Sequence, residues 1–328
     1  MSRLRVAILG CGGIAARHAG AIATLREEME LVAGCGRDLG RTQAFTAQHG
    51  GTAFTELDRM LDEARPDLAI VALPPYRHDG EVERIAARGV HLLVEKPIAL
   101  DQATADRMVR AAEAAGVVAA VGFMYRFGDA VRRWRQADTG PVGLFAGAYH
   151  CNALHAPWWR ERAKSGGQML EQVIHQIDLI RHLVGDPDSV TARCANLFHE
   201  EVPGYDIEDV SAILFSWDDG RIATLHASNI AVPGVWHKEW SIYARSATGR
   251  FTGWNDAVLI WTRDDPHQET IAGKTDPFVA QLADLAEAIR ARRAPHVPLR
   301  EGAASLRLAI AARRSAETRQ EIRLRDGA

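Results

Sequence analysis

The chain has 328 residues, of which 47% are hydrophobic and 25% are charged, a composition typical of globular proteins. This length predicts two domains and is sufficient for a large core without disulfides. The net charge of −3 gives no basic surface of the kind that binds nucleic acid or an anionic membrane, so we expect neither partner.

The cysteines and the N-terminal segment bear on the cellular compartment. Four cysteines are scattered along the chain and include no C-x-x-C pair, which argues against a disulfide framework and fits a reducing compartment. The first apolar run covers only residues 6–9, so it is too short for a signal peptide. No stretch approaches the ~18 apolar residues that a membrane span needs. The sequence therefore predicts a cytoplasmic protein.

The first part of the chain alternates short apolar runs with segments of helical periodicity. The predicted strands are residues 4–9, 31–35, 68–73, 91–94 and 117–121. They are apolar on both faces, as expected for a parallel sheet that helices cover on both sides. The pattern predicts an α/β N-terminal Rossmann domain, a doubly wound parallel sheet, over residues 1–122.

The turn after the first predicted strand reads GCGGIA, residues 10–15. Gly10, Gly12 and Ala15 fill the pattern G-x-G-x-x-A, in which the glycines permit a tight turn and close approach of a pyrophosphate. Gly13 and Ile14 then begin a helix whose N-terminus favours phosphate groups. These residues predict a dinucleotide site, the alternative being a glycine-rich turn without a ligand.

The end of the second predicted strand bears on which dinucleotide binds. A carboxylate about 20 residues past the glycines holds the ribose 2′-hydroxyl of NAD, whereas an arginine suits the 2′-phosphate of NADP. Gly36 stands at the expected position of the acid and is followed by Arg37 and Asp38. This favours NADP over NAD, with the alternative that Arg37 and Asp38 only begin a solvated helix.

The remainder, residues 123–328, has a different pattern. Apolar runs at 141–153, 210–230, 238–254 and 257–261 follow one another with turn signals and without helices between them. They predict an α+β C-terminal domain with an open, mostly antiparallel sheet, and the tail from residue 277 onward is predicted to be helical.

The segment 210–217 is apolar on both alternate faces. One face of the sheet should be covered by helices, so the other is expected to meet a second sheet or a second subunit. The alternative is a sheet sandwiched within one chain.

The segment 166–185, GGQMLEQVIHQIDLIRHLVG, predicts an amphipathic helix. Its apolar residues form one arc, and Glu171, His175, Asp178 and His182 lie on the opposite arc. The simplest interpretation of such a polar stripe is a helix face exposed to solvent. However, His175 and Asp178 are three residues apart, a spacing at which a carboxylate can orient an imidazole as a general base. A metal site is less favoured, because an H-x-x-D pair supplies only two ligands, and we expect no metal.

A third motif is HLLVEKPIALD, residues 91–101, where a predicted buried strand ends in Glu95, Lys96 and Pro97. A lysine at the edge of a core is costly unless its charge is used. The carboxyl ends of strands in open α/β sheets are where ligands bind, which makes Lys96 a candidate. The alternative is a surface lysine that extends its head into water.

Taken together, these segments resemble the glucose–fructose oxidoreductase/inositol dehydrogenase (Gfo/Idh/MocA) family of NAD(P)-dependent oxidoreductases. The resemblance extends over nearly the whole chain. It is carried by GCGGIAARHAGAI at the first turn, VALPPYRH at 71–78, EKPIAL at 95–100, GFMYRF at 122–127, the helix at 166–185, and DPFVAQLADL at 276–285.

The resemblance implies a hydride transfer between NADP(H), or less favourably NAD(H), and a hydroxyl or ketone of a sugar, sugar derivative or cyclitol. Lys96, His175 and Asp178 match the catalytic residues, and the bond to Pro97 is expected to be cis. The implied cofactor contacts are Gly10, Gly12, Gly13, Ile14, Arg37, Leu73, Pro74, His78, Glu95, Lys96 and Arg126. The implied substrate contacts are Lys96, Arg126, Trp159, Glu171 and His175.

The chain also departs from the family pattern. Many members read D-x-G-x-H where this chain has Glu171 and Val173 before His175, which leaves the substrate open. Trp158 and Trp159 suit the stacking of a sugar ring but could equally belong to a core or an interface. The resemblance also implies a homodimer or homotetramer. Alternatives are a dihydrodiol-dehydrogenase-like enzyme, suggested by the sequence GRD at 36–38, and a non-catalytic redox regulator that binds a dinucleotide.

Overall fold

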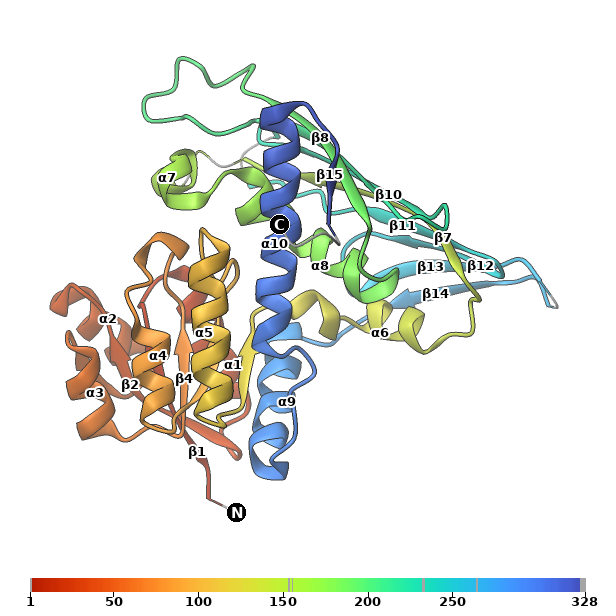
Figure 1. The fold of residues 1–328 in the computed structure, drawn as a ribbon. Coiled ribbons are helices and arrows are strands. Elements are labelled where there is room, and N and C mark those ends of the chain that lie inside the picture. The colour runs from red at the N-terminus through yellow and green to blue at the C-terminus, as the bar shows by residue number, and fades with distance from the viewer. Residues whose placement is uncertain (1, 153, 155, 232–233, 264, 325–328) are drawn as a thin grey trace. The chain divides into compact units, whose positions relative to one another are not determined.

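The computed structural model describes residues 2–152, 154, 156–231, 234–263 and 265–324 (Figure 1). The chain divides into two compact units. The first takes in residues up to Met124 together with Asp276–Ala303, and the second takes in Tyr125–Thr275 together with the chain from Ala304 onward. The sequence had suggested one boundary at 122, with all later residues in the second domain. The structure differs for 276–303, because apolar side chains of this segment pack into the core of the first unit.

The first unit contains a six-stranded parallel sheet in the order β3-β2-β1-β4-β5-β6, which confirms the predicted doubly wound fold. Its strands are β1 (Leu4–Leu9), β2 (Met29–Cys35), β3 (Thr52–Phe54), β4 (Leu68–Val71), β5 (His91–Val94) and β6 (Ala119–Val121). The three-residue edge strand β3 was not predicted. Such a short run carries too few residues for a periodic pattern.

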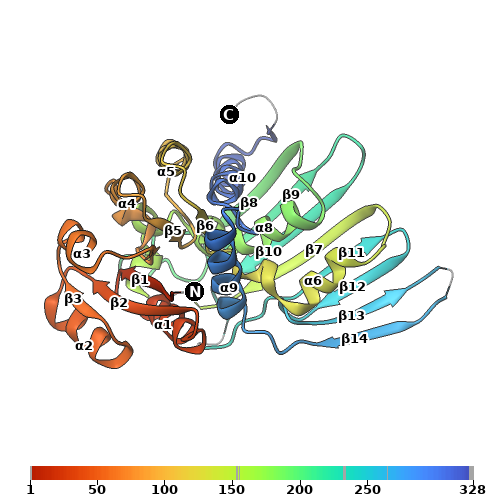
Figure 2. The ribbon, with the colours of Figure 1, turned by 90° about the horizontal axis from the view of Figure 1, so that it is seen from below.

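Helices cover both faces of this sheet (Figure 2). On one face lie α1 (Gly13–Thr24), α2 (Leu39–His49) and α9 (Pro277–Ala291), and on the other lie α3 (Leu57–Ala64), α4 (Glu81–Ala87) and α5 (Gln102–Ala114). Burial on both sides explains why β4 and β5 are almost continuously apolar.

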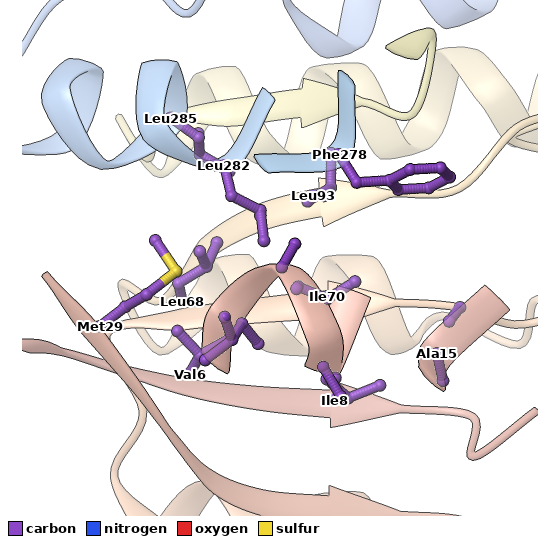
Figure 3. Packing of buried hydrophobic residues seen from close by; sticks show 14 of the residues in the cluster. Val6, Ile8, Ala15, Met29, Leu68, Ile70, Leu93, Phe278, Leu282 and Leu285 are labelled. Atoms are coloured by element: carbon purple, nitrogen blue, oxygen red, sulfur yellow. The ribbon is translucent and has the colours of Figure 1, made fainter. Parts of the chain in front are cut away.

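The core of the first unit joins segments that are far apart in the sequence (Figure 3). Val6 and Ile8 of β1 and Ile70 of β4 are fully buried, and Leu282 and Leu285 of α9 are fully buried in the same cluster. Burial of such side chains is worth about 1.5–3 kcal/mol each. Helix α9 is therefore an integral part of the nucleotide-binding fold although it lies more than 150 residues after β6 in the chain.

The second unit contains a nine-stranded sheet in the order β14-β13-β12-β11-β7-β10-β9-β8-β15. The pairs are antiparallel except for β7 with β10, so the predicted mostly antiparallel sheet is confirmed. The strands are β7 (Val142–His150), β8 (Ser189–Ala195), β9 (Val210–Ser216), β10 (Ile222–Ser228), β11 (Trp240–Ala244), β12 (Ala247–Phe251), β13 (Asp256–Trp261), β14 (Gln268–Ala272) and β15 (Ile322–Arg323). Strands β8, β14 and β15 were not predicted, and Ala153, the end of the predicted run 141–153, lies outside the described residues.

The helical elements of the second unit are short. They are the 3₁₀ turns η2 (Met124–Phe127), whose first residue belongs to the first unit, and η3 (Pro157–Arg160), together with α6 (Asp129–Gln136), α7 (Arg162–Ser165), the π-helical turn η4 (Met169–Val173) and α8 (Ile174–Leu183). Helix α10 (Leu299–Thr318) contains the division between the two units.

The two faces of the second sheet differ. Helix α8 packs on one face, where Gln176 donates a hydrogen bond to the carbonyl of Ala148. The opposite face leaves apolar side chains exposed, with Leu214, Ile222 and Tyr243 at 39%, 42% and 41%. In the described part of the chain no second layer covers these side chains, so the alternative of a sheet sandwiched within one chain is wrong.

None of the helices in the described residues combines the length and the apolar character that a membrane span requires.

Candidate active site

The predicted cofactor residues of the first unit follow four neighbouring strands. Gly10 comes after β1, Arg37 after β2, Leu73 after β4 and Lys96 after β5. Because the strands are parallel, their carboxyl ends lie at one edge of the sheet, which is where open α/β sheets bind ligands.

The turn between β1 and α1 has room for a phosphate group. Gly10 has φ +93°, and a Cβ there would lie 2.5 Å from the carbonyl oxygen of Ala72, so no side chain fits. A Cβ on Gly12 or Gly13 would meet no atom within 4 Å. Helix α1 has no side-chain cap at Gly12 and no acidic residue in its first turn. The first N–H groups of the helix, including that of the exposed Ile14, therefore suit a pyrophosphate.

The packing at the end of β2 explains why residue 36 is a glycine and not the acidic residue that would bind the ribose 2′-hydroxyl of NAD. A Cβ on Gly36 would lie 2.6 Å from Oγ1 of Thr42, so the backbone position tolerates glycine best. The side chain of Asp38 caps α2, its Oδ1 accepting a hydrogen bond of 2.8 Å from the amide of Arg41. Arg37 is exposed. Asp38 thus does begin a helix, as the alternative interpretation held, and contact of Arg37 with a 2′-phosphate stays a prediction.

The predicted cofactor residues that follow β4 differ in how deeply they are buried. Leu73 and Pro74 are half-buried in the loop that leads into η1 (Pro75–Arg77). The side chain of His78 is buried, and its Nδ1 forms a hydrogen bond with Glu81 Oε1. Burial by itself raises the pKa of the Glu81 carboxyl, but the hydrogen bonds from His78 and the Asp79 amide outweigh it and hold the pKa below its usual value. Any contact of the His78 side chain with a cofactor stays a prediction.

The E-K-P turn is built around a buried acid. The bond between Lys96 and Pro97 is cis, as expected. Glu95 is buried, its Oε1 lies 2.7 Å from His18 Nε2, and its Oε2 accepts a hydrogen bond of 3.2 Å from the Lys96 amide. A Cβ on Gly122 would lie 2.8 Å from Oε2 of Glu95, so this position also needs glycine. The carboxylate therefore supports the turn that presents Lys96.

His18 is a residue that the sequence reasoning missed. It is fully buried on α1 and its ring packs edge-to-face on Phe278 at 5.3 Å. The available signal was its position three residues after Ala15, on the face of α1 that packs into the sheet.

In the second unit, three of the four residues in the predicted polar stripe of helix 166–185 are buried, and the fourth, His182, is half-buried. Glu171, His175 and Asp178 are 5%, 5% and 0% exposed, so the alternative of a solvated face is wrong for all three. Glu171 lies in the π-helical turn η4, directly before α8 begins at Ile174. Such turns inside helices occur frequently at functional sites.

Asp178 forms a bidentate ion pair with Arg126. Its Oδ1 accepts a hydrogen bond of 2.6 Å from Arg126 Nη2, and its Oδ2 accepts one of 2.8 Å from Arg126 Nε. Ser305 Oγ donates a third bond of 3.1 Å to Oδ1. Arg126 and Ser305 were not predicted as partners of this carboxylate, and the orientation of His175 by Asp178 stays a prediction.

His175 lies against an aromatic ring. The imidazole stacks on Tyr125 with ring centroids 4.4 Å apart and an interplanar angle of 7°. Tyr125 in turn packs on Trp254, with centroids 4.4 Å apart. The predicted substrate residue Trp159 contacts Trp236 edge-on at 6.1 Å. The second unit therefore presents a buried histidine in aromatic surroundings, which suits proton transfer next to a sugar ring.

The described residues contain no group of three or more histidine, cysteine or acidic side chains that could hold a metal ion.

Comparison with known families matches both units. Residues 4–123 match the model described as an oxidoreductase family with an NAD-binding Rossmann fold, and residues 127–249 match the GFO/IDH/MocA C-terminal domain.

Two curated relatives illustrate the range of the similarity. The 2,7-anhydro-N-acetylneuraminate hydratase of Mediterraneibacter gnavus is 29% identical over 69% of this chain and 61% of its own length. This chain thus spans less than two thirds of that relative. The myo-inositol 2-dehydrogenase of Thermotoga maritima is 22% identical over 98% of this chain and 99% of its own.

A solved structure has the same fold. Levoglucosan dehydrogenase in complex with NADH and levoglucosan aligns with a TM-score of 0.91, covering 99% of this chain and 100% of that chain at 17% identity. Both family matches and the fold agree with the resemblance found in the sequence, which is confirmed. The chain belongs to the Gfo/Idh/MocA family of oxidoreductases with an NAD-binding Rossmann domain.

Proposed function

We propose that the protein transfers a hydride between a nicotinamide dinucleotide and a hydroxyl-bearing carbon of a sugar, sugar derivative or cyclitol. The observation that carries the proposal is the buried His175, held against Tyr125 in the unit that lacks the nucleotide fold. A buried histidine is a suitable general base, and the family membership supplies the reaction class.

Each unit has its own task in this proposal. In the first, the N–H groups at the start of α1 hold the pyrophosphate, and Lys96 places positive charge beside the developing alkoxide. In the second, His175 takes the hydroxyl proton during oxidation and returns it during reduction. The nicotinamide, when bound, accepts or supplies the hydride. Asp178 orients His175, with Glu171 and Trp159 among the substrate contacts.

The finer choice of cofactor rests on Arg37. NAD binding follows from the family model, and we expect NADP to be preferred because Gly36 offers no carboxylate to the 2′-hydroxyl and the exposed Arg37 can meet a 2′-phosphate. The proposed assembly is a homodimer or homotetramer through the exposed face of the second sheet. The four cysteines form no disulfide within the described part of the chain, which supports a reducing, cytoplasmic location.

The test is an absorbance screen at 340 nm of polyols and ketoses with NAD and NADP. We expect turnover with at least one sugar or cyclitol, and His175→Ala should lower kcat by ~10²–10⁴ while the dinucleotide Kd changes little. His267→Ala is the matched control, because His267 is exposed in the same unit. Near-wild-type turnover by His175→Ala would remove His175 from the mechanism.

The screen also separates the rival functions. Turnover confined to aromatic diols would favour a dihydrodiol-dehydrogenase-like enzyme. Dinucleotide binding without turnover on any substrate would favour a redox regulator.

A second candidate function follows from the similarity to a hydratase. A net addition or loss of water leaves the absorbance at 340 nm unchanged. Mass spectrometry of the products, run in parallel on each reaction, would detect a mass change of one water. Such a change without a change in absorbance would favour a hydratase over a dehydrogenase.

A further inference from the structure

Lys238 lies among four aromatic rings of the second unit. Its Nζ is 4.8 Å from the ring centroid of Trp236, 5.2 Å from Trp254, 5.5 Å from Tyr149 and 5.6 Å from Tyr125. The negative faces of aromatic rings attract a cation at such distances. The four rings therefore hold a positive charge at a defined place, and we call these five residues the Lys238 cluster.

The sheet explains why these residues meet. Trp236, Lys238 and Trp240 alternate along the segment that leads into β11, so they project toward the same face. Trp240 is buried on the inner face, and Tyr149 of β7 is buried on that face too. Two backbone hydrogen bonds of 2.7 and 2.8 Å, to the carbonyls of residues 239 and 237, tie the segment to the end of β7.

The cluster continues to the proposed base. Tyr125 has the imidazole of His175 stacked on its ring, and it also packs against Trp254. Trp236, at the other side, contacts Trp159. A molecule whose reacting carbon is at His175 could therefore extend along aromatic surfaces toward Lys238.

An open cavity adjoins the cluster. It has a volume of about 290 Å³ and lies between residues 236–238 and the loop 252–256. This is near the lower end of the ~300–1,000 Å³ range of ligand pockets. Trp236 is 37% exposed, Lys238 is half-buried, and both residues line the cavity.

The acidic groups near the cluster bear on the sign of the charge that a ligand of this cavity would carry. Asp256 lines the cavity, and its Oδ1 accepts a hydrogen bond of 3.2 Å from the amide of Gly273. Burial raises the pKa of Tyr149 well above its usual value, and the charges of its neighbours, Glu171 among them, add to the increase. Glu171 is thus a second acidic residue of this region. Lys238 is the cation of the cavity lining, and its partly desolvated charge attracts an anion more strongly than a surface lysine does.

We propose that the cavity beside Lys238 is a substrate subsite for an anionic substituent, a carboxylate or a phosphate, on the sugar. Lys238 pairs with the anion, and the faces of Trp236 and Trp254 stack against the sugar ring. The proposal rests on the proposed function, because it names the class of sugar that the same site accepts. The rival is a lysine that only holds four rings together.

The experiment compares kcat/KM for matched substrates that differ only in the anionic group. One arm pairs glucuronate with glucose, and the other pairs glucose 6-phosphate with glucose, so the arms separate carboxylate from phosphate. We expect the wild type to prefer the anionic member of at least one pair tenfold or more. Lys238→Met should reduce that preference at least tenfold, whereas Lys238→Arg, which keeps the charge, should retain most of it. Lys274→Met, at an exposed lysine of the same unit, is the control and should leave the ratio unchanged.

The outcomes are distinguishable. Equal use of both members of each pair by the wild type, or an unchanged ratio in Lys238→Met, overturns the subsite while leaving the dehydrogenase proposal intact. No turnover on any sugar with either dinucleotide overturns the proposed function itself. If Lys238→Met does not fold, the wild type decides alone: a tenfold preference that falls in 0.5 M salt supports the subsite, and a preference that salt does not change overturns it.

Discussion

Gly36 and Arg37 occupy the end of β2, where dinucleotide-binding proteins place the group that meets the adenosine ribose. A charge-assisted hydrogen bond is worth about 1.5–3 kcal/mol. Arg37→Gln should therefore lower kcat/KM with NADP by ~10-fold or more and change the value with NAD much less. Steady-state kinetics with both dinucleotides measures the ratio.

The choice of Arg37 rather than Gly36 for this test follows from packing. Gly36→Asp would bring Cβ within 2.6 Å of Thr42 Oγ1, so it would mix a steric effect with the electrostatic one. Arg110→Gln, at an exposed position on α5, is the matched control. A wild-type preference for NAD of tenfold or more would contradict the interpretation of residues 36–38.

Asp178 is the residue at which stability and catalysis are hardest to separate. Its carboxylate is fully buried and pairs with Arg126 through two hydrogen bonds. Removal of one partner of a buried pair leaves an uncompensated charge and typically costs about 3–5 kcal/mol. We therefore expect Asp178→Asn to lower the free energy of unfolding by about that amount, as measured by urea unfolding, in addition to any effect on kcat.

A second arginine-paired aspartate provides the control. Asp218 accepts two hydrogen bonds of 3.0 Å from Arg323, and the side chains of Asp218 and Arg323 are 58% and 49% exposed. Exposed ion pairs contribute about 0–1 kcal/mol, so Asp218→Asn should be nearly neutral. If both variants lose the same free energy of unfolding, burial does not explain the contribution of the Arg126–Asp178 pair to stability.

At the scale of elements, the β1–α1 turn contains two glycines with different tasks. Gly10 is needed for the fold, because its φ of +93° and the 2.5 Å approach of Ala72 exclude a side chain. Gly12 has an extended conformation that any residue can adopt, and no protein atom lies near its Cβ position. Space that the protein does not fill at Gly12 fits the approach of a pyrophosphate.

This difference gives a paired prediction. Gly10→Ala should destabilise the protein by about 1–3 kcal/mol, because a strained backbone conformation is added to a steric overlap. Gly12→Ala should leave stability within ~0.5 kcal/mol but weaken dinucleotide binding tenfold or more. Thermal unfolding and fluorescence titration with NADH and NADPH measure the two effects. Unchanged dinucleotide affinity in Gly12→Ala would contradict the assigned cofactor site.

The elements also show what the sequence could predict. The strands β1, β4 and β5 were identified because buried parallel strands are short continuous apolar runs, and the bounds of β1 and β5 agree fully. Strand β14, whose side chains are exposed or half-buried, was missed because its residues, QETIA, carry no strong apolar pattern. Helix α9 was recognised as helical, but its place in the first unit depends on packing with distant segments, which local periodicity does not contain.

The candidate site was likewise predictable only where local sequence patterns identify its residues. Motifs located Lys96, His175 and Asp178, because these residue types recur at fixed spacings. Their partners were missed, since Ser305 lies 127 residues from Asp178 and His18 lies 77 residues from Glu95. The four rings around Lys238 likewise come from four separate stretches of chain. Such contacts exist only once the sheet and its helices have formed.

At the scale of the whole molecule, the exposed face of the second sheet predicts self-association. Leu144 is paired with Ile222 on one neighbouring strand and with Tyr243 on the other, so the half-buried Leu144 and the two exposed side chains form a continuous apolar row. Exposed apolar patches of this kind mark interfaces, and a twofold axis would let the face pair with itself. We expect light scattering at ~10 µM to give a mass of at least two chains of 35.9 kDa.

A charge placed in the middle of this row tests whether it is the interface. Ile222→Lys would bury an ammonium in the interface with a second copy, and an unpaired buried charge is strongly unfavourable, so the variant should shift to a single chain. Leu39→Lys is the control: Leu39 is 48% exposed but lies on α2 in the first unit, and this variant should assemble like the wild type. If the wild type is already a monomer at this concentration, or if Ile222→Lys assembles as well as Leu39→Lys, the apolar face of the sheet is not where copies of the chain meet.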